Sequence, residues 1–159
     1  MRRVRTPILS AIGAALLALT GEAGAAVPAA ATARLSTSRP GARPVALVVT
    51  FRTELRCGRF AHDALSIRLP ARARVPAAVP ASAVSVGQRR AARVRVAGDV
   101  LTVELAAPKG VATCMVISEG PVTVAVSRAA GLGNPPRAGA YRLTVLDGAQ
   151  TYVAPLAVR

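Results

Sequence analysis

The chain has 159 residues, of which 52% are hydrophobic, and its 21 basic and 7 acidic residues give a formal net charge of +14. This length suits a single domain. With one histidine, two cysteines and no CxxC spacing, the sequence offers no cluster of metal ligands, and we expect no metal site and no cofactor.

The first 25 residues have the pattern of an export signal. Three arginines within the first five residues precede an apolar run at residues 8–19, and Ala23 and Ala25 supply the small residues of a cleavage site. The run is too short to cross a bilayer, and no later stretch has the length and apolarity of a transmembrane helix. We therefore expect a cleaved signal peptide over residues 1–25, and a mature chain that is secreted, periplasmic or held at the cell surface.

Residues 26–44 are rich in Ala, Pro, Ser and Thr and have no clear apolar period. Such a composition is typical of a disordered leader, so the folded domain is expected to span residues 45–159.

From residue 45 onward the apolar period is two, which predicts half-buried strands. Turn-forming residues, mainly Gly, Pro and Asp, separate these stretches. In one hairpin, Gly98 and Asp99 form a two-residue turn, so Val94 should face Val103 and Arg93 should face Glu104. The pattern predicts an all-β domain, an antiparallel two-sheet sandwich of seven to nine strands. The alternating stretches lie at residues 47–51, 65–69, 93–96, 101–105, 122–126 and 141–145.

The two cysteines, Cys57 and Cys114, both follow the export signal. An isolated pair in an oxidising compartment most simply forms one disulfide. Closing a loop of this length would stabilise the fold by roughly 4 kcal/mol on the chain-entropy model.

The strand order also resembles a known module. The segments LSIRLP, VPAAVPASAVSVG and VRVAGDVLTVEL are followed by a closing block at residues 131–145. Together they resemble the repeated immunoglobulin-like β-sandwich module of bacterial secreted and surface-layer-like proteins, present here in a single copy. The resemblance covers roughly residues 46–146 and implies an extracellular structural or adhesive role without catalysis. The matching residues are Leu69, Pro70, Val75, Pro76, Val79, Val84, Val86, Gly98, Val103, Gly131, Leu132, Asn134, Pro135, Gly139, Tyr141, Leu143 and Val145.

Catalytic motifs are sparse. His62 stands beside Asp63, but neighbouring residues of a strand point to opposite faces, and no GxSxG elbow occurs. The six acidic residues after the signal are scattered, as is usual for surface positions, although two of them could meet in space as in a glycosidase. The segment that follows Gly133 could be a ligand loop, but its glycines and prolines more simply build a tight connection. We expect the Tyr141 ring to pack in the core and the Tyr141 hydroxyl to form a hydrogen bond with the loop at residues 134–138.

Charge supplies the remaining clue. After the signal, 18 basic and 6 acidic residues remain, and such a field would attract anionic cell-wall polymer. The bias toward arginine also fits a GC-rich coding sequence, and a single basic face would favour polymer binding whereas an even spread would favour coding bias. We expect no nucleic-acid partner, because the aromatic platform of a single-strand binder is missing. The candidate polyanion-binding residues are Arg68, Arg89, Arg90, Arg93 and Arg95.

The sequence therefore predicts a secreted, non-catalytic structural or adhesive module, with a cell-wall polymer or a surface protein as its partner. One alternative is electrostatic attachment to an anionic cell-surface polymer. A second alternative, from a different class, is a small secreted hydrolase.

Overall fold

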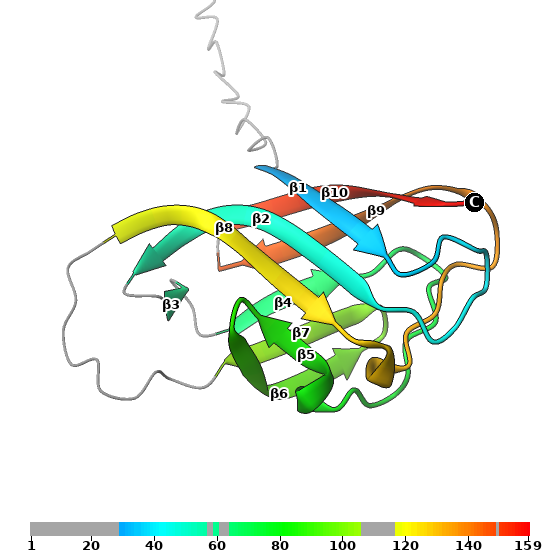
Figure 1. The fold of residues 1–159 in the computed structure, drawn as a ribbon, viewed down its shortest axis with the longest axis horizontal. Coiled ribbons are helices and arrows are strands. Elements are labelled where there is room, and N and C mark those ends of the chain that lie inside the picture. Colours follow the sequence, from blue (N-terminus) through cyan, green and yellow to red (C-terminus); the bar gives the residue numbers. More distant parts are fainter. Residues whose placement is uncertain (1–28, 57–58, 61–63, 106–116, 149) are drawn as a thin grey trace, which may run out of the picture.

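The computed structural model describes residues 29–56, 59–60, 64–105, 117–148 and 150–159. The regular structure of this part of the chain consists of β-strands and two short 3-10 helices (Figure 1). The helices are η1 (Ala81–Ala83) and η2 (Arg128–Ala130), and neither has the length or apolarity to cross a membrane. The strands are β1 (Ala29–Leu35), β2 (Leu47–Arg56), β3 (Arg59–Phe60), β4 (Ala64–Arg68), β5 (Val84–Val86), β6 (Arg89–Ala97), β7 (Val100–Leu105), β8 (Ile117–Val126), β9 (Gly139–Asp147) and β10 (Gln150–Val158).

Nine of the described strands close into a barrel. Their order is β1-β10-β9-β4-β7-β6-β5-β8-β2, and β2 pairs back onto β1, while β3 extends β2 at one end. The expected two-sheet sandwich is therefore wrong in architecture, although the all-β class is confirmed. The resemblance to an immunoglobulin-like module is overturned with it, because such a module keeps two separate sheets.

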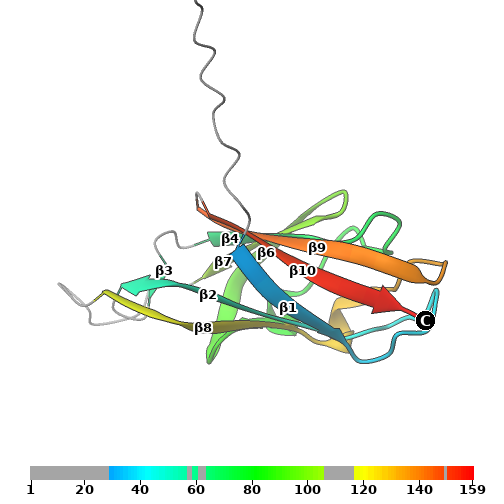
Figure 2. The same cartoon turned by 90° about the horizontal axis from the view of Figure 1, so that it is seen from above.

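Two corner strands close the barrel. Ala29 and Ala30 of β1 pair in parallel with β10, and the rest of β1 pairs antiparallel with β2. On the other side, β6 begins against β5 and continues against β7, with a register irregularity between Ala91 and Arg93. Figure 2 shows β1 lying between β10 and β2. Each corner strand thus forms backbone hydrogen bonds with strands of both walls.

Strand β1 also corrects the expected domain boundary. Residues 29–35 were expected to belong to a disordered leader, but they form a strand of the barrel. The alternation was present in weak form, since Ala31 is buried whereas Thr32 and Arg34 are exposed. Small alanines at the inward positions concealed the period.

The barrel interior is packed with Val, Leu, Ile and Ala, as expected, together with one aromatic pair. The rings of Phe51 and Tyr152 lie with their centroids 4.7 Å apart at an interplanar angle of 39°, and Tyr152 is completely buried. Burial of this aliphatic and aromatic surface supplies the main driving force for folding.

Candidate functional site

Face A is the outer surface of the wall formed by β9, β4, β7 and most of β6. Alternation along these strands turns their basic side chains outward. The hairpin register is confirmed, because Arg93 faces Glu104 and Val94 faces Val103. Glu104 pairs with Arg95, whose Nε lies 3.0 Å from Oε1, and an exposed pair of this kind adds little stability. The arginines of face A are Arg68, Arg93, Arg95 and Arg142.

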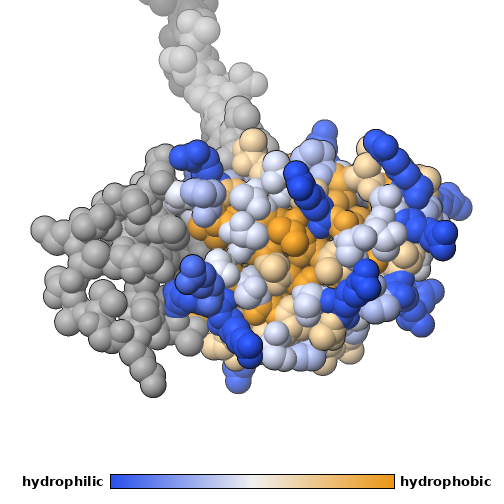
Figure 3. Space-filling model, viewed as in Figure 1, coloured by the Kyte–Doolittle hydropathy of each residue, from blue (hydrophilic) through white to orange (hydrophobic). Residues whose placement is uncertain are grey.

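Face B is the outer surface of the opposite wall, formed by β1, β2, β8, β5 and the start of β6. Figure 3 looks onto this face and shows strongly hydrophilic side chains around an apolar and weakly polar centre. Arg34, Arg52 and Arg90 are exposed here, and none of them contacts a carboxylate among the described residues. The outward residues between them are neutral: Thr32, Val48, Thr50, Ser85, Thr123 and Ala125.

The five arginines expected to bind polyanions do not come together. Arg68, Arg93 and Arg95 lie on face A, whereas Arg90 lies on face B. Arg89 pairs with the inward-facing Val86 and is half-buried, with its Nη2 atom buried. The arginines therefore spread over both faces, which favours coding bias as the source of the total charge. Sequence reasoning missed Arg34, because it lies in the segment assigned to the leader.

Face B has a shallow hollow beside Arg90. Its volume is about 280 Å³, and it runs between the ends of β2 and β8 and the 3-10 helix η1. Three hydroxyl-bearing residues, Ser82, Ser85 and Ser127, line it together with Val48 and Arg90. The hollow thus combines a cation, hydroxyl groups and a small apolar floor.

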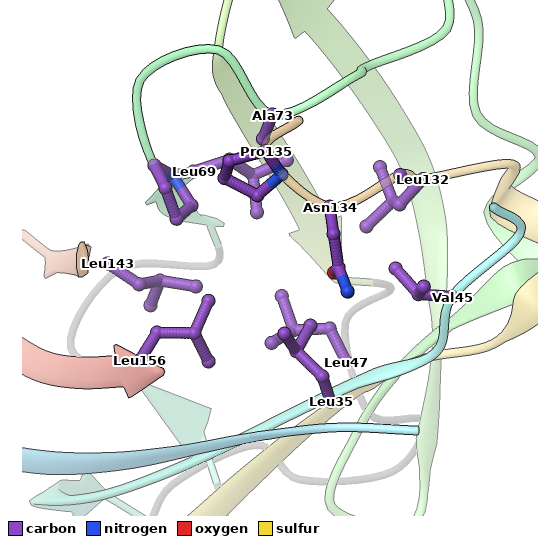
Figure 4. A pocket seen from close by; sticks show the side chains of 12 residues that line it. Leu35, Val45, Leu47, Leu69, Ala73, Leu132, Asn134, Pro135, Leu143 and Leu156 are labelled. Carbon is purple, nitrogen blue, oxygen red and sulfur yellow. The ribbon is translucent and has the colours of Figure 1, made fainter. Parts of the chain in front are cut away.

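The loop after Gly133 is a tight connection and shows no sign of a ligand site. The Asn134 Nδ2 atom donates hydrogen bonds to the carbonyl oxygens of Thr37 at 2.8 Å and Arg39 at 2.9 Å. The apolar cavity beside it has a volume of only about 20 Å³, enough for a single water (Figure 4). The Asn134 side chain points into this cavity, and its Oδ1 atom has no hydrogen-bond partner among the described residues.

Asp147 differs from the surface role expected for the acidic residues. It is 5% exposed, and its Oδ2 atom accepts a hydrogen bond from the Thr53 hydroxyl at 2.7 Å. Its inward position could have been read from the alternation of β9, since residues 143, 145 and 147 share one side. Asp99 lies in the β6–β7 turn and Glu104 on face A, so these three acids are in separate places.

Several expected residues lie outside the described part of the chain. They include Cys57 and Cys114 of the expected disulfide, His62, Asp63 and the whole signal segment. Within the described residues, no group of three or more His, Cys, Asp or Glu side chains is placed to hold a metal ion.

Comparison with known proteins adds a structural likeness. No family model matches the chain, and no curated protein matches it either. Among solved structures, a crystal structure of BslA, a bacterial hydrophobin, is similar, with 12% sequence identity and a TM-score of 0.46 over 82% of this chain and 98% of that one.

Proposed function

We propose that this chain is a non-catalytic structural or adhesive barrel that acts outside the cytoplasm, secreted or at the bacterial cell surface. The observation that carries the proposal is the packed interior of the barrel. Its aliphatic core is filled, and the apolar cavity beside Asn134 has a volume of only about 20 Å³, so the described part of the interior offers no space for a substrate. The export pattern at residues 1–25 supports the location.

Fractionation of cells that express the full chain tests this proposal. We expect the protein in the extracellular or envelope fraction, with an N-terminal sequence that begins at Ala26. Replacement of Leu16 and Leu17 by Arg is the matched control, because it interrupts the apolar run and should retain the chain inside the cell. An uncleaved wild-type chain in the cytoplasm would contradict the location.

A second candidate function is electrostatic attachment to an anionic cell-surface polymer. It is supported by Arg34, Arg52 and Arg90, which have no carboxylate partner among the described residues and so leave their charge available to a ligand. We expect the folded protein to be retained on isolated cell-wall material at low salt and released at high salt, because exposed charges are screened within about 8 Å at physiological ionic strength. Retention that does not depend on salt would contradict this function.

A further inference from the structure

One row of residues crosses the whole width of face B. Strand register places Arg34 beside Val48, Val48 beside Ala125, Ala125 beside Ser85 and Ser85 beside Arg90. Four strand-to-strand steps of about 4.8 Å each give a path of about 19 Å along the wall from Arg34 to Arg90, and the curvature at the corner strands β1 and β6 makes their direct separation shorter. The row therefore has one cation at each end and a neutral floor between them.

The residues between the two arginines carry only hydroxyl groups and small apolar groups. The adjacent row carries Thr32, Thr50 and Thr123, and the Thr50 and Thr123 hydroxyls lie 3.2 Å apart within hydrogen-bonding distance. The hollow beside Arg90 adds Ser82 and Ser127 to Ser85 of the row. Hydroxyl groups and small apolar groups thus fill the space between the two arginines.

Among the described residues, the charged side chains near the row are basic. The acidic positions of the β2–β8 ladder, Glu54 and Glu119, are register partners on adjacent strands. Glu54 lies six residues along β2 from Val48, about 20 Å at the usual rise of a strand. This distance is more than two screening lengths at physiological salt, so the row attracts anions.

We infer that this row binds an extended anionic polysaccharide that contacts Arg34 and Arg90 together; this assignment rests on the proposed electrostatic attachment. Arginine matches carboxylate or phosphate groups through two parallel hydrogen bonds. The threonine and serine hydroxyls suit the hydroxyls of the sugar rings between the charges. At about 280 Å³, the hollow beside Arg90 is below the usual range of a pocket for a drug-sized ligand, and it is suited to one unit of a longer chain.

Other occupants fit less well. A second copy of this face would place arginines against arginines, which is repulsive. A bilayer would need several large apolar side chains, whereas Val48, at 39% exposure, is the large exposed aliphatic residue of face B among the described residues. Single-stranded nucleic acid would need aromatic side chains for stacking, and the described outward positions of face B contain none.

The two-arginine arrangement predicts a dependence on ligand length. We propose titrating the full mature chain with galacturonic acid oligomers of increasing length. Once an oligomer extends beyond about 19 Å, contact with the second arginine becomes intramolecular, and affinity should rise by about tenfold or more. Arg34→Gln and Arg90→Gln should each abolish this rise, leaving oligomers of every length with the weak affinity of the single remaining arginine contact.

Arg142→Gln on face A is the matched control and should retain the rise, and thermal melting should show that all three variants fold. A rise that persists in Arg34→Gln and Arg90→Gln, or an equal loss in Arg142→Gln, would overturn the inference. Tighter, Arg34-dependent binding to single-stranded DNA or to phosphatidylglycerol vesicles would identify a different occupant and also overturn it. If the wild type binds isolated cell-wall material but no oligomer, the inference alone fails. If the wild type binds neither at low salt, the electrostatic function fails as well.

Discussion

Asn134 holds together two loops that lie far apart in the sequence. Its side-chain amide donates to Thr37 and Arg39, which precede it by 97 and 95 positions, and its backbone N–H donates to the Ala42 carbonyl at 3.0 Å. Gly133 permits the close approach, because a Cβ atom there would lie 3.2 Å from the Cβ atoms of both Arg43 and Arg74. These contacts anchor the connection between β1 and β2 to the loop that leads into β9.

Asn134→Ala should destabilise the protein by about 1–3 kcal/mol, because two carbonyl groups lose a partly buried donor. Urea denaturation measures the loss. Thr37→Ala is the control, since it removes only the exposed hydrogen bond that the Arg39 N–H donates to the Thr37 hydroxyl at 3.3 Å and keeps the Thr37 carbonyl. A loss of equal size in both variants would mean that the Asn134 amide does not hold this loop.

Tyr141 joins β9 to the preceding turn. Its hydroxyl donates to the Arg137 carbonyl at 2.9 Å, as expected from the sequence, although its ring is only half-buried. Tyr141→Phe should therefore cost less than about 1.5 kcal/mol, and Tyr141→Ala should lower the melting temperature by several degrees more. Calorimetry of both variants measures the two contributions. If Phe and Ala were equally destabilising, the ring would contribute no packing energy.

At the scale of the elements, the β6–β7 hairpin gives a sharp test of register. Val94 packs against the core and faces the fully buried Val103, whereas Glu104 is on face A. Val94→Asp should cost at least about 2 kcal/mol, because it places a charge against apolar neighbours. Glu104→Ala should cost less than about 1 kcal/mol. Denaturant unfolding that gave the same cost for both would indicate a register shifted by one residue.

Strand β1 can be tested in the same way. Ala31 is buried and pairs with Phe51, whereas the adjacent Thr32 is exposed and pairs with Thr50. Ala31→Asp should strongly destabilise the barrel, by about 3 kcal/mol or more, and Thr32→Asp should change its stability by less than about 0.5 kcal/mol. Thermal melting compares the two, and equal tolerance of both would return residues 29–35 to a leader outside the fold.

Alternation predicted the longer strands whose inward residues are Val, Leu or Ile, because burial of these side chains is what creates the period of two. It failed for β1, where the inward-facing Ala31 and Ala33 are small, and it left the short β5 and the last strand, β10, unassigned. Asp147 was expected on the surface because acidic residues are usually exposed, although the alternation of β9 gives it an inward position. Side-chain type thus indicated the buried positions reliably only where the residue was large and apolar.

At the scale of the whole molecule, the sequence did not reveal that the two walls are joined. A sandwich and a flattened barrel need the same inward and outward residues, and they differ only in whether corner strands pair on both sides. The sequence did not reveal the distribution of arginine on the surface either. Arg34 and Arg90 lie in one row only because five strands from distant parts of the chain pair side by side. Surface patterns of this kind depend on topology, which local periodicity does not encode.

The parallel contact between β1 and β10 has a consequence for the order of folding. Ala29 pairs with Tyr152, so the first strand of the barrel finds one of its two neighbours only after nearly the whole chain is available. A chain made from its N-terminus can form the β6–β7 hairpin early, but ring closure comes last and carries a large loop-closure entropy. Until then the edges of β1 and β10 are unpaired and open to association with other chains. The protein is therefore most vulnerable to aggregation late in its maturation, when the other strands of the barrel already have their partners.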